Sequence, residues 1–103
     1  MFTLIWSHQA ESDYIDILEY WMNHNKSNKY STKLIDEVEK KEKLISKNPN
    51  IGSLSEIEGV RYILIDKNFS LYYRINDDVI EILAFWDNRR DPDSLSLEYK
   101  KKP

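Results

Sequence analysis

The period of hydrophobic and polar positions changes along the chain. A short apolar run at residues 2–6 is followed by apolar residues at helical spacing over 10–22, and by a second helical pattern over 30–46. From residue 60 onward, apolar residues alternate with polar ones or form continuous apolar runs, which is typical of strands. The pattern predicts the order strand, helix, helix, strand, strand, strand.

Both predicted helices carry signals for where they begin and end. The hydroxyl of Ser7 can cap the first helix, which should end within the polar stretch from Asn23 to Asn28. The second is expected from Tyr30 to Ser46, because a proline at position 49 cannot continue it. Two helices joined by so short a loop should pack as an antiparallel hairpin. The predicted inner faces consist of Ala10, Tyr14, Ile17, Leu18, Trp21 and Met22, and of Tyr30, Leu34, Ile35, Val38, Leu44 and Ile45.

Three strand patterns follow the helices. They cover 60–65, the alternating stretch 69–75, and 79–86, which is apolar on both sides. A strand with two apolar faces usually lies inside a sheet. We therefore predict an α+β fold, β-αα-β-β-β, with an antiparallel sheet and the helical hairpin packed on one face.

Length and composition limit what the chain can be. With 103 residues it has room for one domain, expected over 1–95 with a C-terminal tail at 96–103. The absence of cysteine excludes thiolate metal sites and fits a reducing compartment, so we expect a cytoplasmic protein. No apolar segment approaches the roughly 20 residues that cross a bilayer, so no membrane partner is expected. A net charge of -3 argues against general nucleic-acid affinity.

No metal or cofactor site is expected. His8 and His24 flank the first predicted helix about 24 Å apart at 1.5 Å rise per residue, so they cannot share a ligand. The sequence contains no zinc-binding HExxH pattern, and two glycines are too few for a phosphate-binding loop.

Several short motifs, taken together, resemble one protein family. They are Trp6-Ser7, the segment 17–21, Pro49 with Gly52, the start Gly59-Val60-Arg61, and the ending formed by 73–75 and 82–92. In this order and spacing the chain resembles the RelE/ParE superfamily, the bacterial toxins of type II toxin–antitoxin systems. The resemblance implies growth inhibition, a role in plasmid stabilization, and a cognate antitoxin protein as partner.

The resemblance implies two different activities on one scaffold. RelE-like members cut messenger RNA on the ribosome, whereas ParE-like members bind DNA gyrase without nuclease chemistry. In RelE-like enzymes a central-strand arginine and a later tyrosine serve the cleavage. Ser70 and Leu95 stand at the matching positions here, and Tyr99 lies outside the matched stretch. Of the matching cations, Arg89 is retained. These differences favour the ParE-like activity over the nuclease.

A metal-independent ribonuclease could still be assembled from other residues. Its cations would be Arg61, Arg74 and Arg89, and Tyr72 would donate the proton to the leaving oxygen. The alternative is that Arg61 and Arg74 form ion pairs with neighbouring acids such as Glu58 and Glu81. A third possibility is a decayed or purely regulatory member of the family that binds its antitoxin and has no toxic activity.

The segment that follows the last strand is the main candidate for binding. Adjacent residues in extended or turn backbone point in different directions. One of Arg89 and Arg90 can therefore make a forked bond to Asp87 or Asp91 while the other faces outward. Trp86 is expected to shield the edge of the core. The predicted target- or antitoxin-binding residues are Arg89, Arg90, Arg61 and Trp86, and the lysine-rich second helix would suit an acidic antitoxin.

Overall fold

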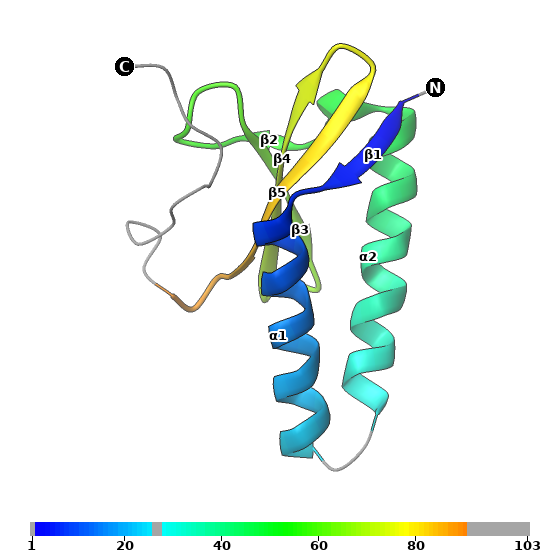
Figure 1. Ribbon diagram of the computed structural model, residues 1–103, viewed down its shortest axis with the longest axis vertical. Helices are drawn as coiled ribbons and strands as arrows, with labels where there is room; N and C mark the ends of the chain where they lie inside the picture. The colour runs from blue at the N-terminus through cyan, green and yellow to red at the C-terminus, as the bar shows by residue number, and fades with distance from the viewer. Residues whose placement is uncertain (1, 26–27, 91–103) are drawn as a thin grey trace.

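The computed structural model describes residues 2–25 and 28–90, and it has the predicted α+β architecture (Figure 1). The element order is β1 (Thr3–Trp6), α1 (His8–Asn25), α2 (Lys29–Lys47), η1 (Pro49–Ile51), β2 (Ser53–Leu54), β3 (Arg61–Ile65), β4 (Phe69–Asn76) and β5 (Val79–Asp87). The fold class and the order of the main elements are confirmed. The short 3-10 helix η1 and the two-residue strand β2 were not predicted, because neither is long enough to show a period.

The sheet is mixed rather than entirely antiparallel. Its strand order is β1-β5-β4-β3-β2, and β1 pairs with β5 in parallel, while the other three pairings are antiparallel. A parallel pair needs a long crossover, and the helical hairpin is part of the chain that connects β1 to the rest of the sheet. β5 lies between β1 and β4, as its two apolar faces predicted.

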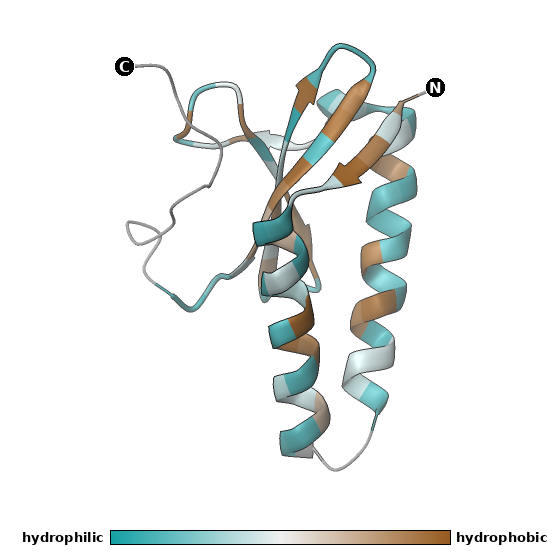
Figure 2. Ribbon diagram, viewed as in Figure 1, coloured by the Kyte–Doolittle hydropathy of each residue, from teal (hydrophilic) through white to brown (hydrophobic). Residues whose placement is uncertain are grey.

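The core lies between the helical hairpin and one face of the sheet. Figure 2 shows that β1 and β5 are largely hydrophobic, while the helices carry alternating hydrophobic and hydrophilic bands. The largest fully buried side chains are Tyr73, Phe69, Phe85, Leu34, Ile45, Ile65, Leu71, Ile80, Ile82 and Val60. The helices bury a narrower stripe than predicted: Met22, Ile35 and Leu44 are 50%, 40% and 38% exposed. The sheet covers only one side of each helix, so residues at the margin of the stripe face solvent.

A buried hydroxyl holds the chain between α2 and β3 against the sheet. Tyr73 on β4 is fully buried; its hydroxyl donates to the Pro49 carbonyl at 2.7 Å and accepts from the Gly52 N–H at 2.9 Å. Burial raises the pKa of Tyr73, so the hydroxyl keeps the proton it donates. This contact gives the Pro49 and Gly52 motif a structural role.

The start of α1 is capped as predicted. The Ser7 hydroxyl accepts from the Ala10 N–H at 3.0 Å and donates to the Leu83 carbonyl at 3.3 Å, so it also joins the helix to β5.

Ser7→Ala should therefore lower the free energy of unfolding by about 1 kcal/mol, the usual effect of losing such a cap. Urea denaturation measures it. Ser12→Ala, an exposed serine on the same helix, is the control and should change stability little. Equal effects of the two substitutions would contradict the role of the cap.

Candidate functional site

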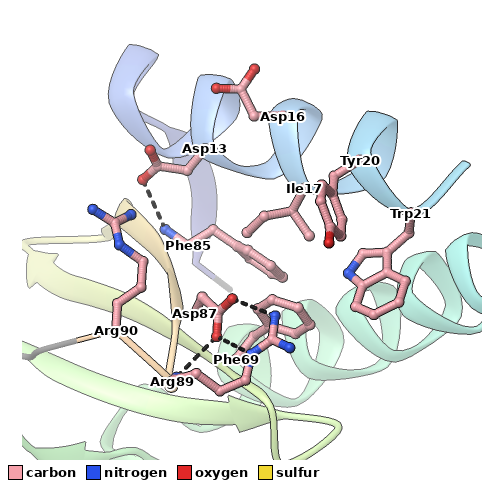
Figure 3. A pocket seen from close by; sticks show the side chains of 10 residues that line it. All are labelled: Asp13, Asp16, Ile17, Tyr20, Trp21, Phe69, Phe85, Asp87, Arg89 and Arg90. Atoms are coloured by element: carbon pink, nitrogen blue, oxygen red, sulfur yellow. Dashed lines mark hydrogen bonds and ion pairs between the residues drawn. The ribbon is translucent and has the colours of Figure 1, made fainter. Parts of the chain in front are cut away.

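The end of β5 and one side of α1 enclose a pocket of about 410 Å³. The pocket collects charged side chains of both signs around an aromatic floor (Figure 3). Its lining residues are Asp13, Asp16, Ile17, Tyr20, Trp21, Phe69, Phe85, Asp87, Arg89 and Arg90. The two arginines of the predicted binding segment therefore lie at a pocket, and their side chains point apart (Figure 3).

Arg89 makes the predicted forked bond, and its partner is Asp87. The guanidinium donates from Nε to Oδ1 at 3.0 Å and from Nη2 to Oδ2 at 2.7 Å, and the backbone N–H of Arg89 donates to Oδ1 at 2.9 Å. The hydrogen bonds from Arg89 lower the pKa of Asp87 below its ordinary value. The pair therefore holds at neutral pH and is lost only as the pH falls through that lowered value. The Arg89 side chain is still 64% exposed, so the paired guanidinium is open to a partner.

Arg90 lies on the indole of Trp86. Its guanidinium carbon is 4.4 Å from the ring centroid, a cation–π distance, and Trp86 is only 7% exposed. Trp86, which was predicted to shield the edge of the core and to take part in binding, is thus buried beneath Arg90. One side of the Arg90 guanidinium therefore packs on the Trp86 ring, and the other side is exposed and available for a contact.

α1 contributes the acids and aromatics that face these arginines. Asp13 Oδ2 accepts from the backbone N–H of Phe85 at 3.3 Å, which ties the helix to β5. Phe69 and Phe85 stack with 5.2 Å between their ring centroids. The pocket thus combines exposed cations, carboxylates and aromatic surface. Arginine and aromatic residues of this kind are enriched among the anchors of protein interfaces.

Sequence reasoning missed the part of the pocket that α1 supplies. Asp13, Asp16 and Tyr20 line the pocket but are not among the binding residues predicted from the sequence. The spacing of 13, 16 and 20 places them on one helical face, and that was the available signal. The contribution of Phe69 and Phe85 had no such signal, because it depends on how β4 and β5 meet the helix.

The residues of the hypothetical nuclease do not converge. Arg61 pairs in register with Tyr73, whereas Tyr72 pairs with Tyr62 on β3 and Ala84 on β5. Registered partners share a face of the sheet and neighbours along a strand alternate, so Arg61 lies on the opposite face from Tyr72 and Arg74. Arg89 follows the last residue of β5, Asp87, and forms its ion pair with that residue on the helix side of the sheet.

Each of these groups also has a structural partner. Arg61 donates to the backbone carbonyls of Gly52 at 2.7 Å and Asn50 at 3.3 Å, rather than to Glu58 as one alternative predicted. Arg74 donates to Glu81 at 2.6 Å, as that alternative predicted.

Tyr72 and Ser70 share a face of β4 with Arg74, opposite to Tyr73. Tyr72 is half-buried, and burial raises its pKa, which makes it a weaker acid. Ser70, at the position where RelE-like enzymes have an arginine, is buried and donates to Asn88 at 2.7 Å. Leu95, Tyr99 and the predicted tail at 96–103 lie outside the described residues.

Within 2–25 and 28–90, no group of three or more His, Asp or Glu side chains could hold a metal ion. Neither helix there is long and apolar enough to span a bilayer.

Comparison with known proteins identifies the family. Residues 4–92 match the family model described as the ParE toxin of the type II toxin–antitoxin system parDE, so the chain belongs to the ParE toxin family. The RelE/ParE assignment made from the motifs is thereby confirmed. The comparison with curated protein sequences gives no match.

Solved structures share the fold. The chromosomal ParDE system of P. aeruginosa aligns with a TM-score of 0.71 and 23% identity, covering 84% of this chain and 96% of that one. The YoeB dimer from Staphylococcus aureus aligns at 0.58 and 21%, covering 82% and 94%. The YoeB/ParE toxin from Agrobacterium tumefaciens aligns at 0.59 and 14%, covering 84% and 98%. At these identities the likeness is one of fold.

Proposed function

We propose that this toxin inhibits growth by binding DNA gyrase, and that it is neutralised by a cognate antitoxin. It acts by occupying a surface of its target, and it breaks no bond in RNA. The contact is made by the cationic pair Arg89 and Arg90 with the aromatic pocket beside them.

The observation that carries the proposal is the separation of the nuclease residues. Arg61 and the pair Tyr72 with Arg74 lie on opposite faces of the sheet, and Arg74 is neutralised by Glu81 at 2.6 Å. Cleavage of RNA needs its cations and its proton donor within hydrogen-bond reach of one phosphate. Binding needs only exposed anchors in a defined geometry. Arginine and aromatic residues beside a pocket are typical of such anchors.

The second part of the proposal, neutralisation by an antitoxin, is supported by the family and by a related structure. The family consists of toxins of type II toxin–antitoxin systems, and one related structure is a YoeB-YefM complex from Staphylococcus aureus. An antitoxin that neutralises this chain either covers the arginine pocket or holds the toxin from elsewhere on its surface.

Induction of the chain without its antitoxin distinguishes binding from cleavage. We expect growth arrest, loss of gyrase supercoiling activity, and messenger RNA ends that are unchanged from those of uninduced cells. Supercoiling assays with purified gyrase and mapping of mRNA ends, run in parallel, measure both activities. Codon-phased mRNA cuts with normal supercoiling would replace the proposal with ribosome-dependent cleavage, and no growth defect would indicate a regulatory member.

A further inference from the structure

We infer that Ser70 and Asn88 are positioning residues for target binding, because together they hold the segment that carries Arg89 and Arg90 in one orientation against the sheet. The inference rests on the proposed function, in which these two arginines make the contact. We call the bonded group around Asn88 the Asn88 clamp. Its members are Lys67, Asn68, Ser70 and Asn88.

The bonds of the Asn88 clamp begin where the strand ladder ends. Asp87 is the last residue of β5 and pairs with the first residue of β4. Beyond this pair, the Asn88 N–H donates to the Asn68 carbonyl at 2.9 Å. In the Asn88 side chain, Oδ1 accepts from the Ser70 hydroxyl at 2.7 Å and Nδ2 donates to the Lys67 carbonyl at 3.2 Å. These hydrogen bonds attach one exposed residue both to β4 and to the turn that precedes it.

The chemistry of the partners fixes which way the Asn88 amide lies. A backbone carbonyl only accepts hydrogen bonds, so the NH2 group must face Lys67, and the amide oxygen is left for the Ser70 hydroxyl. Ser70 is only 3% exposed, so its hydroxyl has little access to water and depends on this bond. The serine at the position where RelE-like enzymes have an arginine thus has Asn88 as its partner.

The turn between β3 and β4, which receives two of these bonds, is itself held by α2. Asp66 and Lys67 in this turn both have positive φ, 51° and 63°, as a tight hairpin turn requires. Asp66 forms an ion pair with Lys33 at 3.3 Å, and the Asn68 amide donates to the Tyr30 hydroxyl at 3.3 Å. Both partners lie on α2, so the turn to which Asn88 is bonded has a fixed place beside the helical hairpin.

The other polar bonds near the arginines lie within the segment. The Arg89 guanidinium bonds the Asp87 carboxylate (Figure 3), and the Arg90 N–H donates to the Asp87 carbonyl at 3.0 Å. These bonds shape a turn, but they do not stop it from pivoting at the end of the strand, and the stacking on Trp86 engages only the Arg90 side chain. Asn88 restricts the pivot. Target binding then has to order less of the chain, which favours affinity.

The test compares gyrase inhibition by the full chain with and without the clamp. Asn88→Ala should need roughly tenfold more protein for half-inhibition of supercoiling, and Ser70→Ala about threefold more, because the target must then order the arginines. The double variant should be no weaker than Asn88→Ala, since Ser70 acts through Asn88. Unfolding by urea should change little, because Asn88 is exposed and water can replace its bonds. Asn76→Ala, at an exposed asparagine at the other end of β4, is the matched control.

Backbone amide relaxation measured by NMR separates positioning from a general loss of structure. The order parameters of Arg89 and Arg90 should fall below about 0.6 in Asn88→Ala and stay at about 0.85 in the unsubstituted chain and in Asn76→Ala. Unchanged order parameters, or inhibition by Asn88→Ala within about twofold of the unsubstituted chain, would contradict the inference while the proposed function stands. If the unsubstituted chain itself does not inhibit gyrase, the proposed function fails, and the contact that the clamp serves fails with it.

Discussion

An Arg89→Ala, Arg90→Ala double variant is expected to lose toxicity and to need about 100-fold more protein for half-inhibition of gyrase supercoiling. Two arginine anchors at the centre of an interface contribute about 3 kcal/mol to binding, which corresponds to that factor. Arg90 presents its guanidinium from the face of Trp86 at 4.4 Å, and Arg89 is held in place by Asp87. Both are pre-ordered and both are exposed, which lowers the entropy lost on binding.

The fold should survive this change, so the effect can be read as a loss of contact. The Arg89–Asp87 pair is exposed on the arginine side, and such pairs contribute little to stability. Arg74→Ala removes an arginine whose partner is Glu81, on the opposite face of the sheet from the pocket, and is the control for charge. Inhibition by the double variant within about threefold of the unsubstituted protein, with unfolding unchanged, would mean that the segment after β5 does not bind the target.

Gly52→Ala is expected to be the most destabilising of the conservative substitutions considered, by about 3 kcal/mol. A Cβ at this position would lie 2.8 Å from the Tyr62 carbonyl oxygen and would collide with the Tyr73 hydroxyl. The collision involves backbone on one side and a fully buried ring on the other, so neither neighbour can move cheaply. It would also separate Tyr73 from the Gly52 N–H and the Pro49 carbonyl, leaving buried polar groups without partners.

Gly59→Ala is the comparison that isolates this packing effect. Gly59 has φ +79 but no heavy atom within 4 Å of its added Cβ, so the substitution meets only backbone strain of about 1–2 kcal/mol. Chemical denaturation of the three proteins measures the difference. A Gly52→Ala variant no less stable than the Gly59→Ala variant would show that the Tyr73 contact does not hold η1 and β2 to the sheet.

The sequence predicted one part of the candidate site, the segment that follows β5. Adjacent arginines bracketed by aspartates predicted one internal pair and one outward cation, and the structure pairs Arg89 with Asp87 while Arg90 lies on Trp86. Which acid would be chosen was open, because Asp87 and Asp91 are equally near in sequence. The aromatic and acidic wall from α1 lies about 70 residues away along the chain, as the Phe85 to Asp13 bond illustrates, and no local pattern reports such a distance.

The sequence by itself determined the two α-helices, the strands β1, β3, β4 and β5, and the buried position of β5, because hydrophobic period and capping are local properties. The sequence also determined the family, because the motifs are recognised by their residue types, order and spacing. Tertiary structure alone decided that β1 pairs in parallel at an open edge. It also decided that Arg61 is divided from Tyr72 and Arg74 by the thickness of the sheet. The physical reason is that strand partners and the face on which each side chain lies follow from register, and register is set by contacts between segments far apart in the chain.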